Sequence, residues 1–275
     1  MAVIITGNNT PTAGGITYGD GSTYAVTAAG TSGRPVVSGG AGAPAFRPYT
    51  LPAADGSASQ VLQTDGAGAL SFATAGSGFS QAQVFTTSGS FTVPASGKFK
   101  VTIIGGGGSG GSYTSYTFGG DSGAGGGNVI KWFSGATPAA TATVTIGTGG
   151  TAVSGNTNGN TGGASTFVLS GFTTLTANGG LRGLAGGSTT FSLGGAATGG
   201  DINVNGQNGG SAAFNGSSQQ SLSSIGGSSL MGFGGILFTQ TANGQPGIGY
   251  GGGGTGAANS GTSGAGTNGI CIVEY

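Results

Sequence analysis

The sequence predicts an all-β protein in which a short oligomeric neck of β-hairpins precedes a glycine-rich head that resembles a β-sandwich. Three observations support this prediction. Short segments rich in β-branched and aromatic residues recur along the chain, and long glycine runs separate them. No segment shows the apolar period of an amphipathic helix. We therefore expect very little helix, and glycine-rich loops that pack together.

The composition favours an ordered chain over a disordered one. Of 275 residues, 68 are glycine, and only 6 are Lys or Arg and 6 Asp or Glu. Disorder is typical of low hydrophobicity combined with high net charge, whereas this chain is 35% hydrophobic with zero formal charge. A collagen helix is excluded because glycine does not recur at every third residue and there are only 8 prolines.

The same composition excludes several classes of function. Six cationic residues do not form the basic surface that binding to nucleic acid or to an anionic membrane requires. Histidine is absent, so the sequence holds neither a Ser-His-Asp nor a Cys-His nucleophile. The spacing GxGxxG occurs by chance in glycine runs and is followed by no helix signal. We expect no cofactor and no enzymatic activity.

The N-terminus lacks a basic and then apolar signal segment, because MAVIITGNN contains no Lys or Arg. No apolar run is long enough to span a bilayer. The sequence therefore predicts a soluble protein, either cytoplasmic or exported without such a signal, as a virion component is.

An internal repeat with an offset of 26 residues lies in the first third of the chain. Residues 30–46 read GTSGRPVVSGGAGAPAF and residues 56–72 read GSASQVLQTDGAGALSF. Each copy predicts a small hairpin with a Gly-Ala-Gly turn and a second strand that ends on phenylalanine. Because one such hairpin does not bury both of its faces, we expect copies to stack on one another in a neck over residues 29–78.

The head is predicted over residues 79–275 and contains better-defined strands. In residues 98–104, Phe99, Val101 and Ile103 alternate with polar residues and should face the core. Further strands are expected at residues 90–94, 128–133, 141–146, 165–169, 172–176 and 269–275.

The glycine runs between these strands are too numerous for independent loops. Glycine allows backbones to approach closely and to adopt extended, polyproline-II-like helices, which have no internal hydrogen bonds. If these segments are buried, the backbone N–H and C=O groups of each must form hydrogen bonds with neighbouring segments. We therefore expect a layered glycine array beside a β-sandwich.

The chain offers few candidates for acid–base or nucleophilic chemistry. Asp121 and Asp201 each follow a Gly pair, where Asp is typical of a turn closed by its own backbone hydrogen bond. The single cysteine, Cys271, lies in an apolar strand and is expected to be a small buried residue. No metal site is indicated.

Four aromatic residues near glycine runs are the candidate receptor-binding residues: Tyr113, Tyr116, Phe118 and Tyr250. Aromatic faces flanked by small residues stack on sugar rings or contact a protein epitope at low entropic cost. The alternative is that these residues cap the glycine array or contact other subunits. Trp132 lies within a predicted strand, where packing in the core or against another subunit is the better interpretation.

Both parts of the sequence resemble bacteriophage tail-fibre or spike proteins. The two repeat segments are similar to neck repeats of virion proteins, and the order SFTVPASGKFKVTIIGGGGSGG, GAGGG before NVIKW, TATVTIGTGG and GICIVEY resembles the distal glycine-rich domain of tail fibres. This resemblance implies a homotrimer in the virion tail, anchored to other tail proteins through residues 1–28, with loops that contact a bacterial surface polysaccharide or outer-membrane protein. It implies no catalysis.

Only about 75 residues precede the head, so a long shaft is missing and a short fibre or spike is expected. The alternative is a purely structural decoration or fibre-joining protein without receptor binding. A polysaccharide depolymerase is disfavoured because the head has three carboxylate residues, and glycosidases need two that flank the scissile bond.

Overall fold

The computed structural model describes residues 12–58, 60–74, 78–114, 119–186, 191–211, 225–236 and 243–275. These residues contain no helix, which confirms the all-β class. Accordingly, none of them belongs to a helix that is long and apolar enough to cross a membrane. The chain divides into two compact units, Met1–Ser77 and Gly78–Tyr275.

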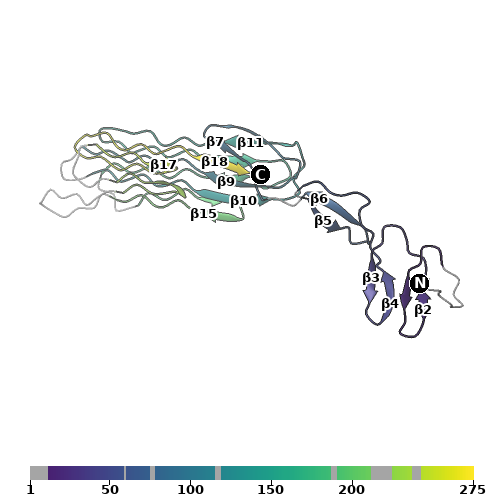
Figure 1. The fold of residues 1–275 in the computed structure, drawn as a ribbon. Helices are drawn as coiled ribbons and strands as arrows, with labels where there is room; N and C mark the ends of the chain where they lie inside the picture. Colours follow the sequence, from purple (N-terminus) through teal and green to yellow (C-terminus); the bar gives the residue numbers. More distant parts are fainter. Residues whose placement is uncertain are drawn as a thin grey trace. The chain divides into compact units, whose positions relative to one another are not determined.

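The described residues of the N-terminal unit form three two-stranded antiparallel sheets (Figure 1). They are β1 (Thr17–Gly19) with β2 (Tyr24–Val26), β3 (Val36–Gly39) with β4 (Gly42–Phe46), and β5 (Gln60–Thr64) with β6 (Leu70–Thr74). The latter two pairs carry the repeat. In each, a glycine lies against the phenylalanine ring of the second strand: a Cβ added at Gly30 or Gly56 would lie 2.4 or 2.6 Å from the ring of Phe46 or Phe72.

The β1–β2 pair lies inside residues 1–28, the segment expected to attach to the virion, where no strand was predicted. Its strands have three residues each, too few to show an alternating pattern. A turn closes the pair, in which the Asp20 carboxylate accepts hydrogen bonds from the backbone amides of Ser22 and Thr23. These bonds stabilise the ionised carboxylate and hold the pKa of Asp20 well below its usual range.

The second unit, the head, is built on two five-stranded antiparallel sheets (Figure 1). In the first sheet the order is β15 (Ile202–Val204), β10 (Asn128–Phe133), β9 (Phe99–Ile104), β18 (Ile270–Glu274) and β7 (Ala82–Phe85). In the second sheet it is β14 (Ala197–Thr198), β13 (Leu175–Ala177), β12 (Ser165–Val168), β11 (Thr141–Thr145) and β8 (Gly89–Thr92).

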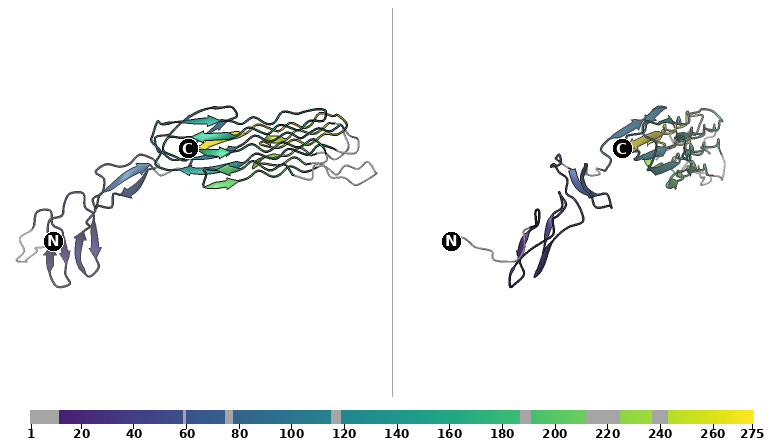
Figure 2. Two further views of the ribbon diagram at one scale, coloured as in Figure 1. Left: turned by 180° about the vertical axis from the view of Figure 1, so that it is seen from behind. Right: turned by 90° about the vertical axis from the view of Figure 1, so that its right-hand side faces the viewer.

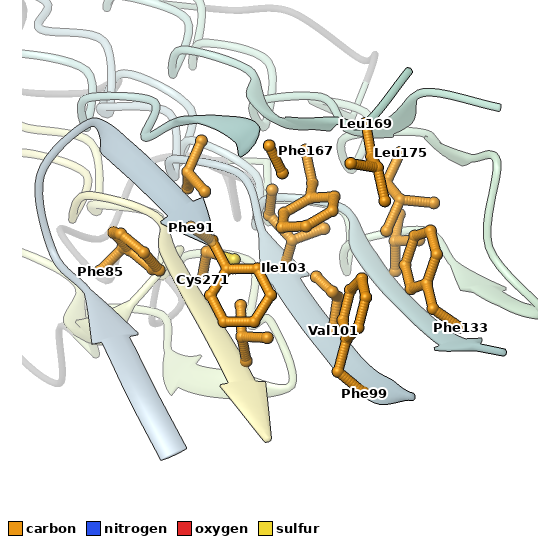
Figure 3. Close-up of a cluster of buried hydrophobic side chains, with 14 of the residues drawn as sticks. Phe85, Phe91, Phe99, Val101, Ile103, Phe133, Phe167, Leu169, Leu175 and Cys271 are labelled. Carbon is orange, nitrogen blue, oxygen red and sulfur yellow. The ribbon is translucent and has the colours of Figure 1, made fainter. Parts of the chain in front are cut away.

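Aromatic side chains from both sheets form the hydrophobic core (Figure 3). Phe99 of the first sheet stacks on Phe133 with 4.5 Å between ring centroids, and Phe167 of the second sheet lies 5.6 Å from Phe133. Phe99, Val101 and Ile103 are all fully buried, which confirms the predicted core face of this strand, although Thr102 on the other face is buried as well. The core therefore lies between two sheets, as in a β-sandwich.

The predicted strands differ from the observed ones mainly at residues 172–176. Phe172 lies in a turn instead, because its backbone N–H donates to the Leu169 carbonyl and Gly171 has a φ of +84°. Five head strands were not predicted, and each has only two to four residues: β7, β14, β15, β16 (Met231–Phe233) and β17 (Ile248–Tyr250).

The glycine runs form an ordered array that continues from one end of the two sheets (Figures 1 and 2). The backbone amides of residues 105–112 donate in rotation to three neighbouring segments, at 2.9–3.0 Å. Every third donor reaches the same neighbour, namely residues 121–127, 157–163 or 264–267. This three-residue period is that of the polyproline-II helix. It bears out the expected layered array.

Residues 120–127 show the same rotation with another set of neighbours. Their amides donate in turn to residues 251–257, 178–184 and 207–210. At many of the glycines the segments approach so closely that no side chain fits: a Cβ added at Gly107 would lie 2.0 Å from the carbonyl oxygen of Gly252. The glycine composition is therefore a packing requirement.

Candidate functional site

The candidate site is the far end of the glycine array, meaning the end remote from the two sheets, where Ser112 pairs with Thr157 and Ala257. Tyr113 is the predicted receptor-binding residue that lies there. Tyr116 and Phe118, the next two candidates, lie outside the described residues.

Backbone hydrogen bonds and ring packing both position Tyr113. Its N–H donates to the Ala257 carbonyl at 3.1 Å, and its carbonyl accepts from the Ser260 N–H at 3.0 Å. The ring lies over Gly186, where an added Cβ would come within 2.4 Å of ring carbons. The residue is half-buried, so one part of the aromatic surface is held against the array and another part contacts solvent.

A tight turn beside Tyr113 has a strained backbone. Asn259 and Ser260 both adopt positive φ, at 50° and 58°, and the Gly261 N–H donates to the Ala258 carbonyl at 2.9 Å. Consecutive positive φ values define a type I′ turn. Ser112 Oγ donates to the Gly261 carbonyl at 2.6 Å and so ties the turn to the array.

Sequence reasoning missed this turn, although Asn before Ser and Gly was an available signal. Asn adopts positive φ more readily than most residues. Backbone outliers that the surroundings enforce cluster at functional sites, so the Asn259–Ser260 turn joins Tyr113 as a candidate for contact with a partner.

Tyr250, the fourth predicted residue, does not lie with Tyr113. It belongs to β17 and pairs with Met231 of β16, and its carbonyl accepts a hydrogen bond from Ser229 Oγ. Tyr113 instead donates a hydrogen bond to Ala257, which lies seven residues after Tyr250. Seven extended residues span roughly 20 Å. The structure therefore does not bring the predicted aromatic residues together in one cluster.

The two aspartates do not form the turns that the sequence predicted. Asp121 is fully buried within an extended array segment, because the glycines before it continue the array instead of turning. Asp201 does not close a turn through its own backbone. Its carboxylate accepts from the Trp132 amide at 2.9 Å and from Lys131 at 3.3 Å, and these interactions lower its pKa.

The separation of these carboxylates also bears on hydrolysis. Asp121 lies eleven residues from Trp132 along the extended segment, which at about 3 Å per residue corresponds to roughly 30 Å. Paired glycosidase carboxylates lie roughly 5–10 Å apart. Among the described residues, no group of three or more His, Cys, Asp and Glu side chains is arranged to hold a metal ion.

The predictions for Cys271 and Trp132 compare differently with the structure. Cys271 is fully buried in the core, as predicted, and burial raises the pKa of its thiol to about 12, so the thiol is unreactive at neutral pH. Trp132 is 48% exposed, so core packing within one chain is the wrong interpretation.

These observations define a class of protein: an all-β head in which a β-sandwich continues into a backbone-paired glycine array. A family model described as a glycine-rich domain matches residues 85–275. The chain belongs to this family of glycine-rich domains. No curated protein matches the sequence.

Proposed function

We propose that this chain is a structural component of a phage tail, a short tail fibre or spike, whose glycine-rich head contacts the host cell surface during adsorption. The observation that carries the proposal is the far end of the array. There an aromatic ring and a strained turn stand on a backbone lattice whose amides are hydrogen-bonded in three directions. A rigid support of this kind lowers the entropic cost of binding.

The N-terminal unit supports the multi-copy part of the proposal. No residue of the unit is buried within its described ranges, 12–58 and 60–74. Val36, Val61 and Leu62 are each exposed by 42–49%. Two-stranded sheets are marginally stable alone, so association with other copies is what would give this unit a core. We propose a homotrimeric neck, with residues 1–28 attached to other tail proteins.

The chemistry of the far end suits a neutral ligand. Tyr113 supplies an aromatic face, and the Asn259–Ser260 turn supplies polar groups without charge. Such surfaces bind sugar rings and polar protein loops. The proposed partner is therefore a bacterial surface polysaccharide or an outer-membrane protein. We assign no catalytic step to the chain.

Competition for adsorption tests this function. The full chain, sized first by light scattering, is added to host cells before the phage, and the rate of phage adsorption is measured. We expect saturating protein to slow adsorption and Tyr113→Ala to abolish most of the competition. Tyr24→Ala, which removes an exposed tyrosine of the N-terminal unit, serves as the control and should compete like the native chain.

Two results would count against the proposal. If saturating native protein leaves adsorption unchanged, the host-contact role is overturned and the purely structural role, decoration or fibre joining, takes its place. If light scattering shows a monodisperse monomer of 25.6 kDa, the multi-copy neck is overturned whatever the adsorption assay shows.

A further inference from the structure

One outer side of the head presents exposed apolar side chains among the described residues. Alternate residues of the first sheet point away from the core, and the strand registers place five of them in one line across the sheet. The line consists of Ile202, Ile130, Thr102, Ile272 and Val84. Its two ends, Ile202 and Val84, are exposed, whereas Thr102 at its centre is buried. A solvent-facing side of an antiparallel sheet is ordinarily polar.

The short ribbon of β16 and β17 continues this side along the array. Gly251, which follows β17, covers Ile104 on the outer side of β9, since an added Cβ would lie 2.7 Å from Ile104 Cγ2. Asn128 links the ribbon to the sheet: its Oδ1 accepts from the Leu230 N–H at 2.8 Å, and its Nδ2 donates to the Val204 carbonyl at 3.3 Å. The sheet face and the ribbon are therefore one continuous surface.

We call this surface the apolar outer side and define it by six residues exposed by 44–72%: Trp132, Ile202, Val204, Leu230, Phe233 and Ile248. At roughly 200 Å² for a large side chain, six that are about half exposed present on the order of 600 Å². That is the area, about 600–1,000 Å², that one partner contributes to a stable interface.

The opposite outer side of the head is built differently. The registers of β11 to β14 place Thr145, Thr166, Thr176 and Thr198 in a line across the second sheet, and none of its five strands carries a charged residue. We call this surface the threonine face. Its hydroxyl groups suit contact with water. Exposed apolar side chains are therefore a feature of the apolar outer side and not of every surface of this low-charge protein.

The charges on the apolar outer side neutralise each other. Lys100 and Glu274 point outward beside Trp132 and form an ion pair at 2.6 Å. Lys131 points to the other side of the sheet, with Phe133, and pairs there with Asp201 at 3.3 Å, so it adds no charge to this surface. An identical surface from another chain therefore meets this one without an unpaired charge, as contact between like subunits requires.

We propose that the apolar outer side packs against another copy of the head. The proposal rests on the proposed function in one respect: the neck holds several copies together, which raises the local concentration of heads. Trp132 and Phe233 then serve as aromatic anchors of the contact, which is typical of interfaces. Tyr250, which shares the β16–β17 ribbon, belongs to this contact and not to the receptor site.

The fluorescence of Trp132 tests the proposal directly, because it is the only tryptophan of the chain. A half-exposed indole in an isolated head becomes shielded when heads pack together. We expect weak quenching by acrylamide in the native full chain. Phe233→Asp, which places a charge on the same surface but on a different element from Trp132, should raise the quenching constant several-fold and shift the emission to longer wavelength.

Val168→Asp is the matched control, since Val168 is 43% exposed on the second sheet and should leave quenching unchanged. Easy quenching of Trp132 in the native protein overturns the proposal and leaves this surface for a different partner. Shielding that persists in Phe233→Asp also overturns it, because something other than this contact then covers the indole. Neither result decides host contact, which the Tyr113→Ala competition measures separately.

Discussion

The two halves of the head are ordered by opposite means. In the sandwich, side chains from two sheets interdigitate, and Phe91, Phe99 and Phe167 are almost completely buried. In the array, backbones approach so closely at many glycines that a side chain there is excluded, and the amides of residues 105–112 and 120–127 each donate to three neighbouring segments. Large side chains stabilise the sandwich and would disrupt the array.

The difference teaches how an uncharged, glycine-rich sequence avoids disorder. Glycine loses more conformational entropy on folding than any other residue, so an array of glycines needs compensation. Its segments extend directly from strands such as β9 and β10, whose positions the core already fixes. The sandwich therefore places the glycine segments in register, and the array adds a dense set of backbone hydrogen bonds.

The largest expected effect is in the sandwich. Phe167→Ala removes a side chain that contacts Phe91 of its own sheet and Phe99 and Phe133 of the other sheet. We expect a loss of about 4 kcal/mol in the free energy of unfolding, from lost burial and a residual cavity. Urea unfolding of the full chain at fixed concentration measures it. The neighbouring exposed Val168→Ala should change stability by less than about 0.5 kcal/mol, and equal losses in the two variants would contradict this account of the core.

In the array, adding a side chain rather than removing one should destabilise the fold. Gly107→Ala adds a single methyl group that would lie 2.0 Å from Gly252 O, so we expect a loss of about 3 kcal/mol, at the upper end for overpacking. Gly89→Ala is the matched control in β8, where the added carbon lies 3.4 Å from the Phe85 ring. Because alanine lowers the entropy of the unfolded chain, this control should unfold at the same or a slightly higher urea concentration. Tolerance of Gly107→Ala would show that backbone packing is not what orders the array.

The strong strands could be predicted from the sequence because their patterns are local. Residues 128–133 coincide with β10, and the alternation in residues 98–104 gives the correct buried face of β9. The array could be expected in kind, since buried glycine amides need partners. Its register could not, because glycine carries no side chain that identifies a neighbour, and the pairing of Gly105 with Gly127 or Gly107 with Thr267 is a tertiary result.

The candidate site was predicted less well than the fold. Tyr113 lies at the far end as an aromatic residue interrupting a glycine run should, yet Tyr250 lies beside the sheets because β17 pairs with β16. The pairing of two three-residue strands leaves little trace in the sequence. The positive φ values of Asn259 and Ser260 likewise depend on Ser112, about 150 residues earlier in the chain.

The smallest of these effects is expected where the two regions meet. Ser165 is fully buried at the start of β12, and its Oγ accepts a hydrogen bond from the Gly147 amide at 2.9 Å. Gly147 lies just beyond β11, where strand pairing ends and array pairing begins. The serine hydroxyl thus bonds a buried amide at the point where one pairing pattern gives way to the other.

Ser165→Ala leaves that amide buried without its acceptor, so we expect a loss of about 2 kcal/mol, the usual cost of an unsatisfied buried donor. Thr166→Ala is the control on the same strand, because Thr166 lies on the threonine face and should change stability by less than about 0.5 kcal/mol. Hydrogen exchange on Ser165→Ala locates the effect. If the Gly147 amide alone exchanges faster, the sandwich and the array are independently stable, whereas faster exchange throughout residues 105–112 means that the array depends on the register that the sandwich imposes.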